Sequence, residues 1–256
     1  MIYITGDTHG DFRRFSTNSF FEQSDMTKDD IVIICGDFGG IWDYRGETSY
    51  EKYWLNWLEE KPFTTCFVDG NHENFNRLYD MPIEHWNGGK VHKIRPSIIH
   101  LMRGQVFELQ GLKFFTFGGA SSHDIDDGIL DECDFSSYQE FVRTRQMWSR
   151  LGKQFRVKNQ SWWEQELPTD SEMIEGVNNL SQSGSNVDYV ISHCLPSSMN
   201  ALISMGTYKS DKLNQYFQDL LDKGINFKRW FSGHYHKSEN VDDKFTVLYN
   251  QIVRIL

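Results

Sequence analysis

Residues Ile31 to Gly40 read Ile-Val-Ile-Ile-Cys-Gly-Asp-Phe-Gly-Gly, an apolar and mostly β-branched run that ends abruptly at a glycine and an aspartate. A short run of this kind, bounded by turn residues, is typical of a strand covered on both faces. In open α/β sheets, ligands bind beyond the carboxyl ends of such strands. The stretch therefore predicts that a buried strand delivers the Asp37 carboxylate to a binding site at the edge of a sheet.

The same construction occurs at four further places in the chain. Each is a short apolar run followed by Asp, Asn or His: Ile2–Thr5 before Gly6-Asp7-Thr8-His9, Cys66–Val68 before Gly70-Asn71-His72-Glu73, Tyr189–Ser192 before His193, and Arg229–Phe231 before Gly233-His234-Tyr235-His236. The carboxyl ends of parallel strands lie at the same edge of a sheet. Five strand ends are therefore expected to carry the ligands of one metal pair.

Length and composition limit the class of protein. The 256 residues are enough for one large α/β domain with an insertion, and we expect a single domain over 1–256. The 4 cysteines are far apart, so neither a disulfide framework nor a zinc knuckle is expected. A cytoplasmic protein without a membrane span is expected, because the N-terminus enters a strand directly and no apolar run approaches ~18 residues. The formal charge of -10 argues against stable binding to duplex nucleic acid.

Strand-like and helix-like segments alternate along the chain, as expected for an α/β fold. Apolar residues at helical spacing and helix-end signals predict four helices, over 11–23, 49–60, 170–183 and 210–224. Short apolar runs separated by Gly104 and Gly111 predict an antiparallel meander over 97–118. A final strand is expected over 245–250.

Residues 119–168 form a segment too long for a simple connection, so we expect a capping insertion. Four aromatic residues recur there every seven positions, namely Phe141, Trp148, Phe155 and Trp162. Six basic residues, with no acidic residue among them, are Arg143, Arg145, Arg150, Lys153, Arg156 and Lys158. Two interpretations stay open: one or two amphipathic helices with a solvated basic face, or a lid that attracts phosphorylated substrate.

The side chains at the five strand ends are suited to binding two metal ions. Asp7 and His9 alternate along an extended loop and can face one ion together. Asp37 has two carboxylate oxygens and can bridge two ions about 3.5 to 4 Å apart. Asn71 offers a carbonyl oxygen. Imidazole nitrogens are offered by His193, His234 and His236. One such histidine alone is more often structural, but the recurrence after five apolar runs favours a metal centre.

In their order along the chain, these motifs resemble those of the calcineurin-like metallophosphoesterase family. The resemblance rests on Gly6-Asp7-Thr8-His9, Gly36-Asp37, Gly70-Asn71-His72-Glu73, His193 and Gly233-His234-Tyr235-His236. It implies an α/β fold, a four-layer αββα sandwich of two mixed β-sheets flanked by helices, with a dinuclear metal site at the strand C-terminal ends. Two further stretches, Gly118–Asp124 and Ser161–Pro168, resemble a bacterial and phage branch of the family.

The resemblance also implies roles for individual residues. One ion is held by Asp7, His9, Asp37 and His236, and the other by Asp37, Asn71, His193 and His234. Manganese (Mn2+) is expected, with iron, zinc, nickel or cobalt as alternatives. His72 is implied to be catalytic, protonating the departing oxygen or stabilising its negative charge.

One position departs from the family pattern. Many members have a second acid three residues after the bridging aspartate, thought to orient the histidine that corresponds to His72, and here that position is Gly40. Asp43 can take its place if the loop folds back. Otherwise His72 works without a carboxylate partner, and we then expect its pKa to lie near the ordinary value of about 6.5.

Four residues are candidates for binding the substrate: Arg45, His123, Asp124 and Arg156. Arg45 resembles the phosphate-binding arginine of the protein phosphatase branch, but its offset from Asp37 differs, and the alternative is a surface arginine. His123 and Asp124 either line the pocket or form a structural turn. Arg156 belongs to the basic segment.

We therefore expect a metal-dependent phosphoester hydrolase in which a metal-bridging hydroxide attacks phosphorus in line. Phosphodiester or nucleotide substrates are slightly favoured. The alternative within enzymes is a serine/threonine protein phosphatase-like phosphomonoesterase acting on phosphoprotein. The alternative from another class is a non-catalytic metal-binding scaffold, which is disfavoured because every candidate ligand is kept.

Overall fold

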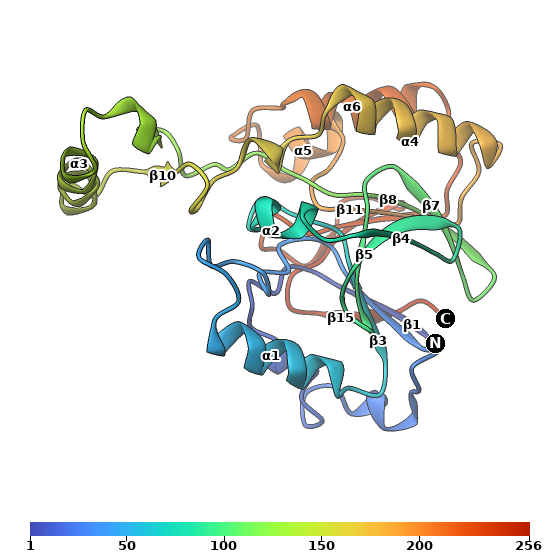
Figure 1. The fold of residues 1–256 in the computed structure, drawn as a ribbon. Coiled ribbons are helices and arrows are strands. Elements are labelled where there is room, and N and C mark those ends of the chain that lie inside the picture. Colours follow the sequence, from blue (N-terminus) through green and yellow to red (C-terminus); the bar gives the residue numbers. More distant parts are fainter.

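The computed structural model describes residues 1–256 and contains two large β-sheets (Figure 1). The first sheet has seven strands in the order β15-β1-β2-β3-β6-β5-β4. Its parallel centre consists of β1 (Ile2–Thr5), β2 (Ile31–Ile34), β3 (Thr64–Phe67) and β6 (Ile98–Leu101). Its antiparallel strands are β15 (Ile252–Arg254), β5 (Gly89–Arg95) and β4 (Ile83–Trp86). Every residue of the central strands is buried, as the continuous apolar runs predict.

The second sheet has six strands in the order β13-β14-β12-β11-β8-β7. Its parallel strands are β8 (Leu112–Phe117), β11 (Tyr189–Ser192), β12 (Arg229–Ser232) and β14 (Phe245–Val247). Its antiparallel strands are β7 (Gln105–Leu109) and β13 (Glu239–Asn240). Both sheets are therefore mixed.

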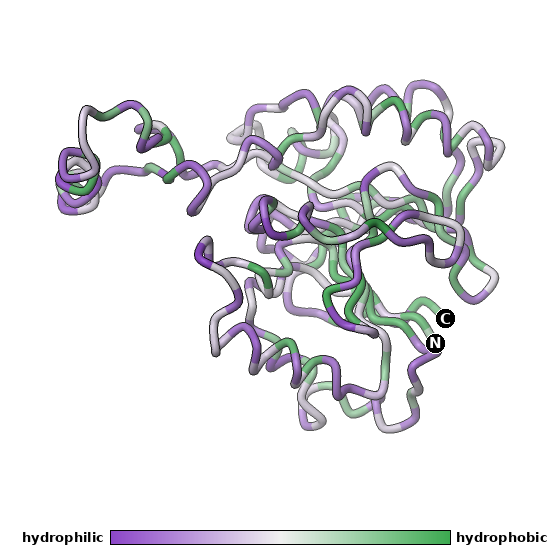
Figure 2. Tube along the Cα trace, viewed as in Figure 1, coloured by the Kyte–Doolittle hydropathy of each residue, from purple (hydrophilic) through white to green (hydrophobic).

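The two sheets pack face to face, and helices cover the outer face of each (Figure 1). The inner core takes residues from both sheets, for example Ile4 from the first and Ile191 from the second. Outside the first sheet lies α1 (Ser49–Glu59), and outside the second lie α4 (Asp170–Gln182), α5 (Ser197–Ile203) and α6 (Lys212–Asp222). Figure 2 shows hydrophobic residues along the inner strands. The predicted sandwich of two mixed sheets flanked by helices is confirmed.

The helices predicted over 49–60, 170–183 and 210–224 are confirmed by α1, α4 and α6. Helix α1 begins with a capping box, in which Thr48 Oγ accepts from the Glu51 N–H at 3.1 Å and the Glu51 carboxylate accepts from the Thr48 N–H at 2.7 Å. No helix combines the length and the hydropathy that crossing a membrane requires.

The helix predicted over 11–23 is wrong. The segment contains the short 3₁₀ helix η1 (Arg13–Phe15) and the start of a second, η2 (Phe21–Asp25). Phe12, Phe15 and Phe20 are nevertheless buried against the outer face of the first sheet. Separations of three and then five residues do not keep these rings on one face of an α-helix, so two turns replace it.

The meander predicted over 97–118 is also wrong, because its strands belong to different sheets. β6 pairs with β3 and β5, whereas β7 and β8 form a hairpin in the second sheet. The elements absent from the prediction include α2 (Phe75–Tyr79), α5, β13 and the hairpin of β4 and β5. Strand β4 lacks a buried residue and so has no apolar run. The final predicted strand is shorter than expected, and β15 follows it as a separate strand.

Residues 119–168 include an arm that projects from the sandwich (Figure 1). Its elements are β9 (Gly128–Leu130), η3 (Glu132–Asp134), α3 (Tyr138–Arg150), β10 (Phe155–Val157) and, nearer the sandwich, η4 (Glu164–Glu166). β9 and β10 pair in parallel, and the arm has a small core of 3 buried residues. Only Phe141 and Trp148 of the aromatic repeat lie on a helix, since Phe155 belongs to β10.

Three of the six basic residues of the arm have acidic partners that precede them in the chain. Three ion pairs form: Lys153 with Asp127 at 3.2 Å, Arg156 with Asp124 at 2.7 Å, and Lys158 with Asp131 at 2.7 Å. The positive charge of the segment is therefore less free than its sequence predicts, and the lid interpretation loses part of its support.

Candidate metal centre

The loops after five strand ends meet at one edge of the sandwich. The Thr8 and His9 N–H groups, which follow β1, donate to the Asp37 carbonyl after β2 at 3.1 and 2.7 Å. The Gly233 N–H, which follows β12, donates to the His193 carbonyl after β11 at 3.1 Å. These hydrogen bonds fix the loops relative to one another, so side chains far apart in the sequence are brought together.

Several non-glycine residues at this edge have positive φ angles, a strained backbone conformation that is common at functional sites. Four candidate ligands have left-handed φ angles, namely His9 (47°), Asp37 (46°), His234 (70°) and His236 (50°). Glycine is required between the loops, because a Cβ on Gly233 would lie 2.0 Å from Asp7 Oδ1 and one on Gly70 would lie 2.1 Å from Asp37 Oδ1.

Asp7, His9, Asp37 and His236 form one compact group, in which each offers a ligand atom within 4.8 Å of the others. His9 Nε2 lies 3.0 Å from His236 Nε2 and 3.8 Å from a carboxylate oxygen of each aspartate. His236 Nε2 also lies 3.3 Å from Asp7 Oδ2, and this hydrogen bond raises the pKa of His236. The group matches the first of the two expected ligand sets.

The second expected set, Asp37, Asn71, His193 and His234, gathers on the other side of Asp37. His193 Nε2 lies 3.3 Å from both Asn71 Oδ1 and Asp37 Oδ1. The His193 ring is fixed from behind, since Nδ1 donates to the Cys35 carbonyl at 2.8 Å and leaves Nε2 for a ligand. The ring centres of His193 and His234 are 4.9 Å apart. Asp37 thus lies between the two groups, where its two oxygens can serve both.

The charge of the site suits cations. Asp7 and Asp37 are buried, and only histidines lie close enough to form ion pairs with them. Burial alone would lower the pKa of His193, but the Asp37 and Asp7 carboxylates raise it to about 10. Buried carboxylates need compensating positive charge. Together with imidazole and amide donors, they fit two first-row divalent ions.

Asn71 is oriented by two residues that the sequence does not single out as functional. Its Nδ2 donates to Ser122 Oγ at 3.3 Å, which turns Oδ1 towards His193. Ser122 in turn donates to the Glu166 carboxyl group from N at 3.0 Å and from Oγ at 2.9 Å. Burial raises the pKa of Glu166 to about 8. Ser122 and Glu166 lie in the two stretches, Gly118–Asp124 and Ser161–Pro168, that resemble a branch of the family. This resemblance is the sequence signal that could have pointed to them.

His72, the candidate catalytic residue, lies beside the metal ligands. Its ring centre is 5.0 Å from that of His9 and 5.6 Å from that of Trp42. The His72 N–H donates to Asp37 Oδ1 at 2.8 Å, and Nε2 lies 3.1 Å from Arg156 Nη2. Burial and the neighbouring Arg156 guanidinium together lower the pKa of His72 to about 4, against the opposing effect of the Asp37 carboxylate. The expected pKa near 6.5 is therefore wrong.

Asp43 does not replace the acid that the family has at the position of Gly40. Its carboxylate accepts from the Arg45 N–H at 2.9 Å and from the Arg45 guanidinium at 3.0 Å. His72 instead contacts Arg156, whose guanidinium donates to Asp124 at 2.7 and 2.9 Å. An arginine held by an aspartate thus occupies the place where a carboxylate was expected.

The four candidate substrate-binding residues separate into two groups. Three of them line a cleft of about 480 Å³ beside the metal ligands, namely His123, Asp124 and Arg156. His123 Nε2 lies 2.7 Å from His234 Nε2, and its ring stacks on Tyr208 with centres 3.8 Å apart. Arg45 is exposed, does not line this cleft, and is paired with Asp43.

Comparisons with known proteins agree with this geometry. A family model described as calcineurin-like phosphoesterase matches residues 1–238. Lariat debranching enzyme A of Xenopus laevis is 26% identical over 149 residues, which cover 53% of this chain and 26% of that protein. Lariat debranching enzyme of Danio rerio is 26% identical over 144 residues, 51% and 24% of the two chains. That of Arabidopsis thaliana is 31% identical over 104 residues, 36% and 25%. The matches thus span about a quarter of the length of these relatives.

Proposed function

Since the chain belongs to the calcineurin-like phosphoesterase family, we propose that it is a metal-dependent phosphodiesterase that acts on nucleotide substrates. The observation that supports this most is the convergence of carboxylate, amide and imidazole groups on both sides of the buried Asp37. Similarity to proteins named lariat debranching enzymes favours a diester over a monoester.

In this proposal the two groups described above hold one divalent ion each, with manganese our first choice. Bound there, such ions supply Lewis acidity that activates water and neutralises charge on the phosphoryl oxygens. Asp37 contributes to both sites, so its loss should be the most damaging single change among the ligands. The hydrogen bond from His193 to Cys35 keeps Nε2 directed at the site.

We propose that His72 and Arg156 act at the departing oxygen. Arg156 donates to His72 Nε2, which assigns the proton of the neutral ring to Nδ1. From Nδ1 the ring can donate to the oxygen of the leaving group, while the guanidinium adds positive charge beside it. In the same proposal His123, which lines this cleft and lies 2.7 Å from His234, contacts a non-bridging phosphate oxygen.

The test is hydrolysis of paired substrates by the manganese-loaded protein. Bis-nitrophenyl phosphate, a diester, should have a higher kcat/KM than nitrophenyl phosphate, a monoester with the same leaving group. A reversed ranking would favour the phosphomonoesterase alternative. Hydrolysis of neither would contradict the proposed function.

A further inference from the structure

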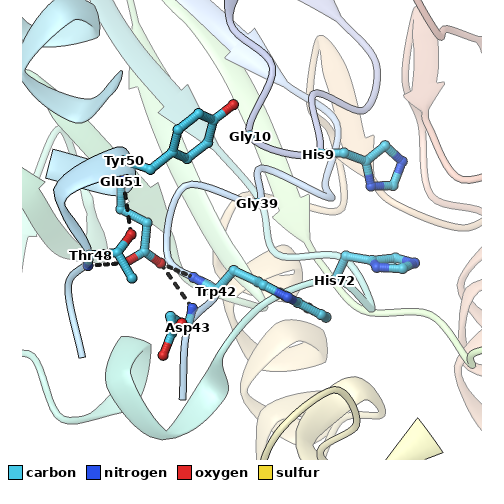
Figure 3. A pocket seen from close by; sticks show the side chains of 9 residues that line it. All are labelled: His9, Gly10, Gly39, Trp42, Asp43, Thr48, Tyr50, Glu51 and His72. Atoms are coloured by element: carbon cyan, nitrogen blue, oxygen red, sulfur yellow. Dashed lines mark hydrogen bonds between the residues drawn. The ribbon is translucent and has the colours of Figure 1, made fainter. Parts of the chain in front are cut away.

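A groove separate from the 480 Å³ cleft opens on the other side of His72. We call it the Trp42 groove; it has a volume of about 410 Å³, and its lining includes His9, Gly10, Gly39, Trp42, Tyr50 and His72 (Figure 3). We propose that this groove binds the nucleobase of the substrate, next to the phosphate held at the metal centre. This inference rests on the proposed function and adds the part of the substrate that the groove recognises.

The walls of the groove suit a flat aromatic ring. Tyr50, near the start of α1, and Trp42, in the loop after β2, stand on either side of the backbone at Gly39 (Figure 3). Tyr50 is 65% exposed, so much of its ring is open to a ligand. Bases stack on such side chains with little dependence on sequence.

The floor of the groove is bare backbone. A Cβ on Gly39 would lie 2.6 Å from Gly10 N, and one on Gly10 would lie 2.9 Å from the Gly39 carbonyl oxygen. Both glycines also have positive φ, at 66° and 74°. The two loops therefore need glycine at both positions in order to pack this closely, and neither position presents a side chain to the groove.

The charge of the groove selects against a second phosphate. None of its lining residues is Lys or Arg. The two acidic lining residues, Asp43 and Glu51, are paired with Arg45 at 3.0 Å and with Arg77 at 2.9 Å, so those guanidinium groups are already engaged. Burial alone would raise the pKa of Glu51, but backbone N–H groups of Thr48, Trp42 and Asp43 lower it, so the carboxylate stays charged. An additional phosphate would therefore find no free positive charge in the lining, whereas an uncharged base needs none.

The groove is continuous with the metal centre. His9 and His72 line the groove, and His9 belongs to the first ligand group. A phosphodiester at the centre thus has one substituent on the side of the groove and the other on the side of Arg156, which lines the cleft. The uncharged base fits the side of the Trp42 groove. The side of Arg156 suits a substituent that carries further negative charge.

The test measures binding, so that it does not depend on catalysis. The manganese-loaded protein is titrated in a calorimeter with adenosine monophosphate and with ribose phosphate, which differ by the base. The groove predicts that the nucleotide binds about 5- to 100-fold more tightly. In Tyr50→Ala this ratio should fall towards one. Because a ratio cancels the contribution of the phosphate, damage to the metal centre does not imitate the effect.

Tyr53→Ala is the matched control. Tyr53 lies on the same helix and is 61% exposed, but it does not line the groove. The ratio should therefore keep its wild-type value in this variant. Equal affinities for the two ligands in the wild type, or an unchanged ratio in Tyr50→Ala, would overturn the proposal. Base-dependent binding without hydrolysis of any phosphoester would support the groove and contradict the proposed function instead.

Discussion

The hydrogen bond between Asn71 and Ser122 makes a prediction about the second ion. Ser122→Ala removes the acceptor of the Asn71 amide, so Oδ1 is no longer held towards His193. Leaving a buried donor without a partner costs about 1–3 kcal/mol. Loss of a group that orients a metal ligand typically weakens metal affinity by about 10–100-fold. The first effect lowers the stability of both the metal-free and the metal-bound protein, whereas the second is expected to weaken binding of the second ion by about one to two orders of magnitude.

Calorimetric titration of the metal-free protein with manganese measures this effect. Two binding events are expected in the wild type. Only the affinity of the event that depends on Asn71 should change in Ser122→Ala. The other ion, held by the group that contains Asp7 and His9, should keep its affinity. Ser121→Ala is the control, because the neighbouring hydroxyl donates to Asp211 instead.

Two results would refute the reasoning. If both ions bind Ser122→Ala with wild-type affinity, Ser122 does not orient Asn71. If both affinities fall equally, the substitution disturbs the whole site and the assignment of Asn71 to one ion loses its support.

Three further predictions follow from buried groups. The pKa of Glu166 is about 8 in the folded protein and near 4.5 in the unfolded chain, so the free energy of unfolding should fall as the pH rises from about 4.5 to about 8. Glu166→Gln should make this fall smaller, as measured by urea unfolding of the metal-free protein at several pH values. His72→Asn removes the proposed hydrogen bond from Nδ1 and should slow hydrolysis of alkyl diesters about 10²- to 10³-fold, while sparing nitrophenyl esters and metal content. Equal losses for the two kinds of substrate would exclude the leaving-group role. Asp69→Ala leaves the buried Arg103 without its carboxylate partner and should lower the free energy of unfolding by about 3–5 kcal/mol. The surface control Glu84→Ala, which removes the partner of Lys93, should lower it by about 1 kcal/mol or less. Similar losses in the two variants would contradict this prediction.

The strand ends are predictable from the sequence because their signal is local. An apolar run followed by Gly-Asp or Gly-Asn predicts both a buried strand and a polar side chain directly after it, as at Asp37 and Asn71. The pairing of strands is less local. β6 and β7 have similar apolar runs, yet they join different sheets, because the chain crosses between the sheets after Leu101.

The surroundings of His72 depend on contacts that no local pattern encodes. Arg156 looks unopposed in the sequence, but pairing of β9 with β10 brings Asp124 beside it from an earlier part of the insertion. Nothing in the local sequence distinguishes Ser122 and Glu166 from other polar residues. Their contacts with Asn71 and with each other form only in the folded protein. Spacing alone can therefore predict which candidate ligands come together, whereas the residues that position them need the tertiary structure.

The central claim is that two ions bridged by Asp37 are needed for phosphodiester hydrolysis, and a stoichiometric titration tests it most directly. Metal-free protein receives increasing amounts of manganese, while bound metal and hydrolysis of bis-nitrophenyl phosphate are measured in the same samples. We predict that activity rises mainly with the second equivalent and stops increasing at two ions per chain. Full activity with one ion per chain, or hydrolysis by the metal-free protein, would contradict the account.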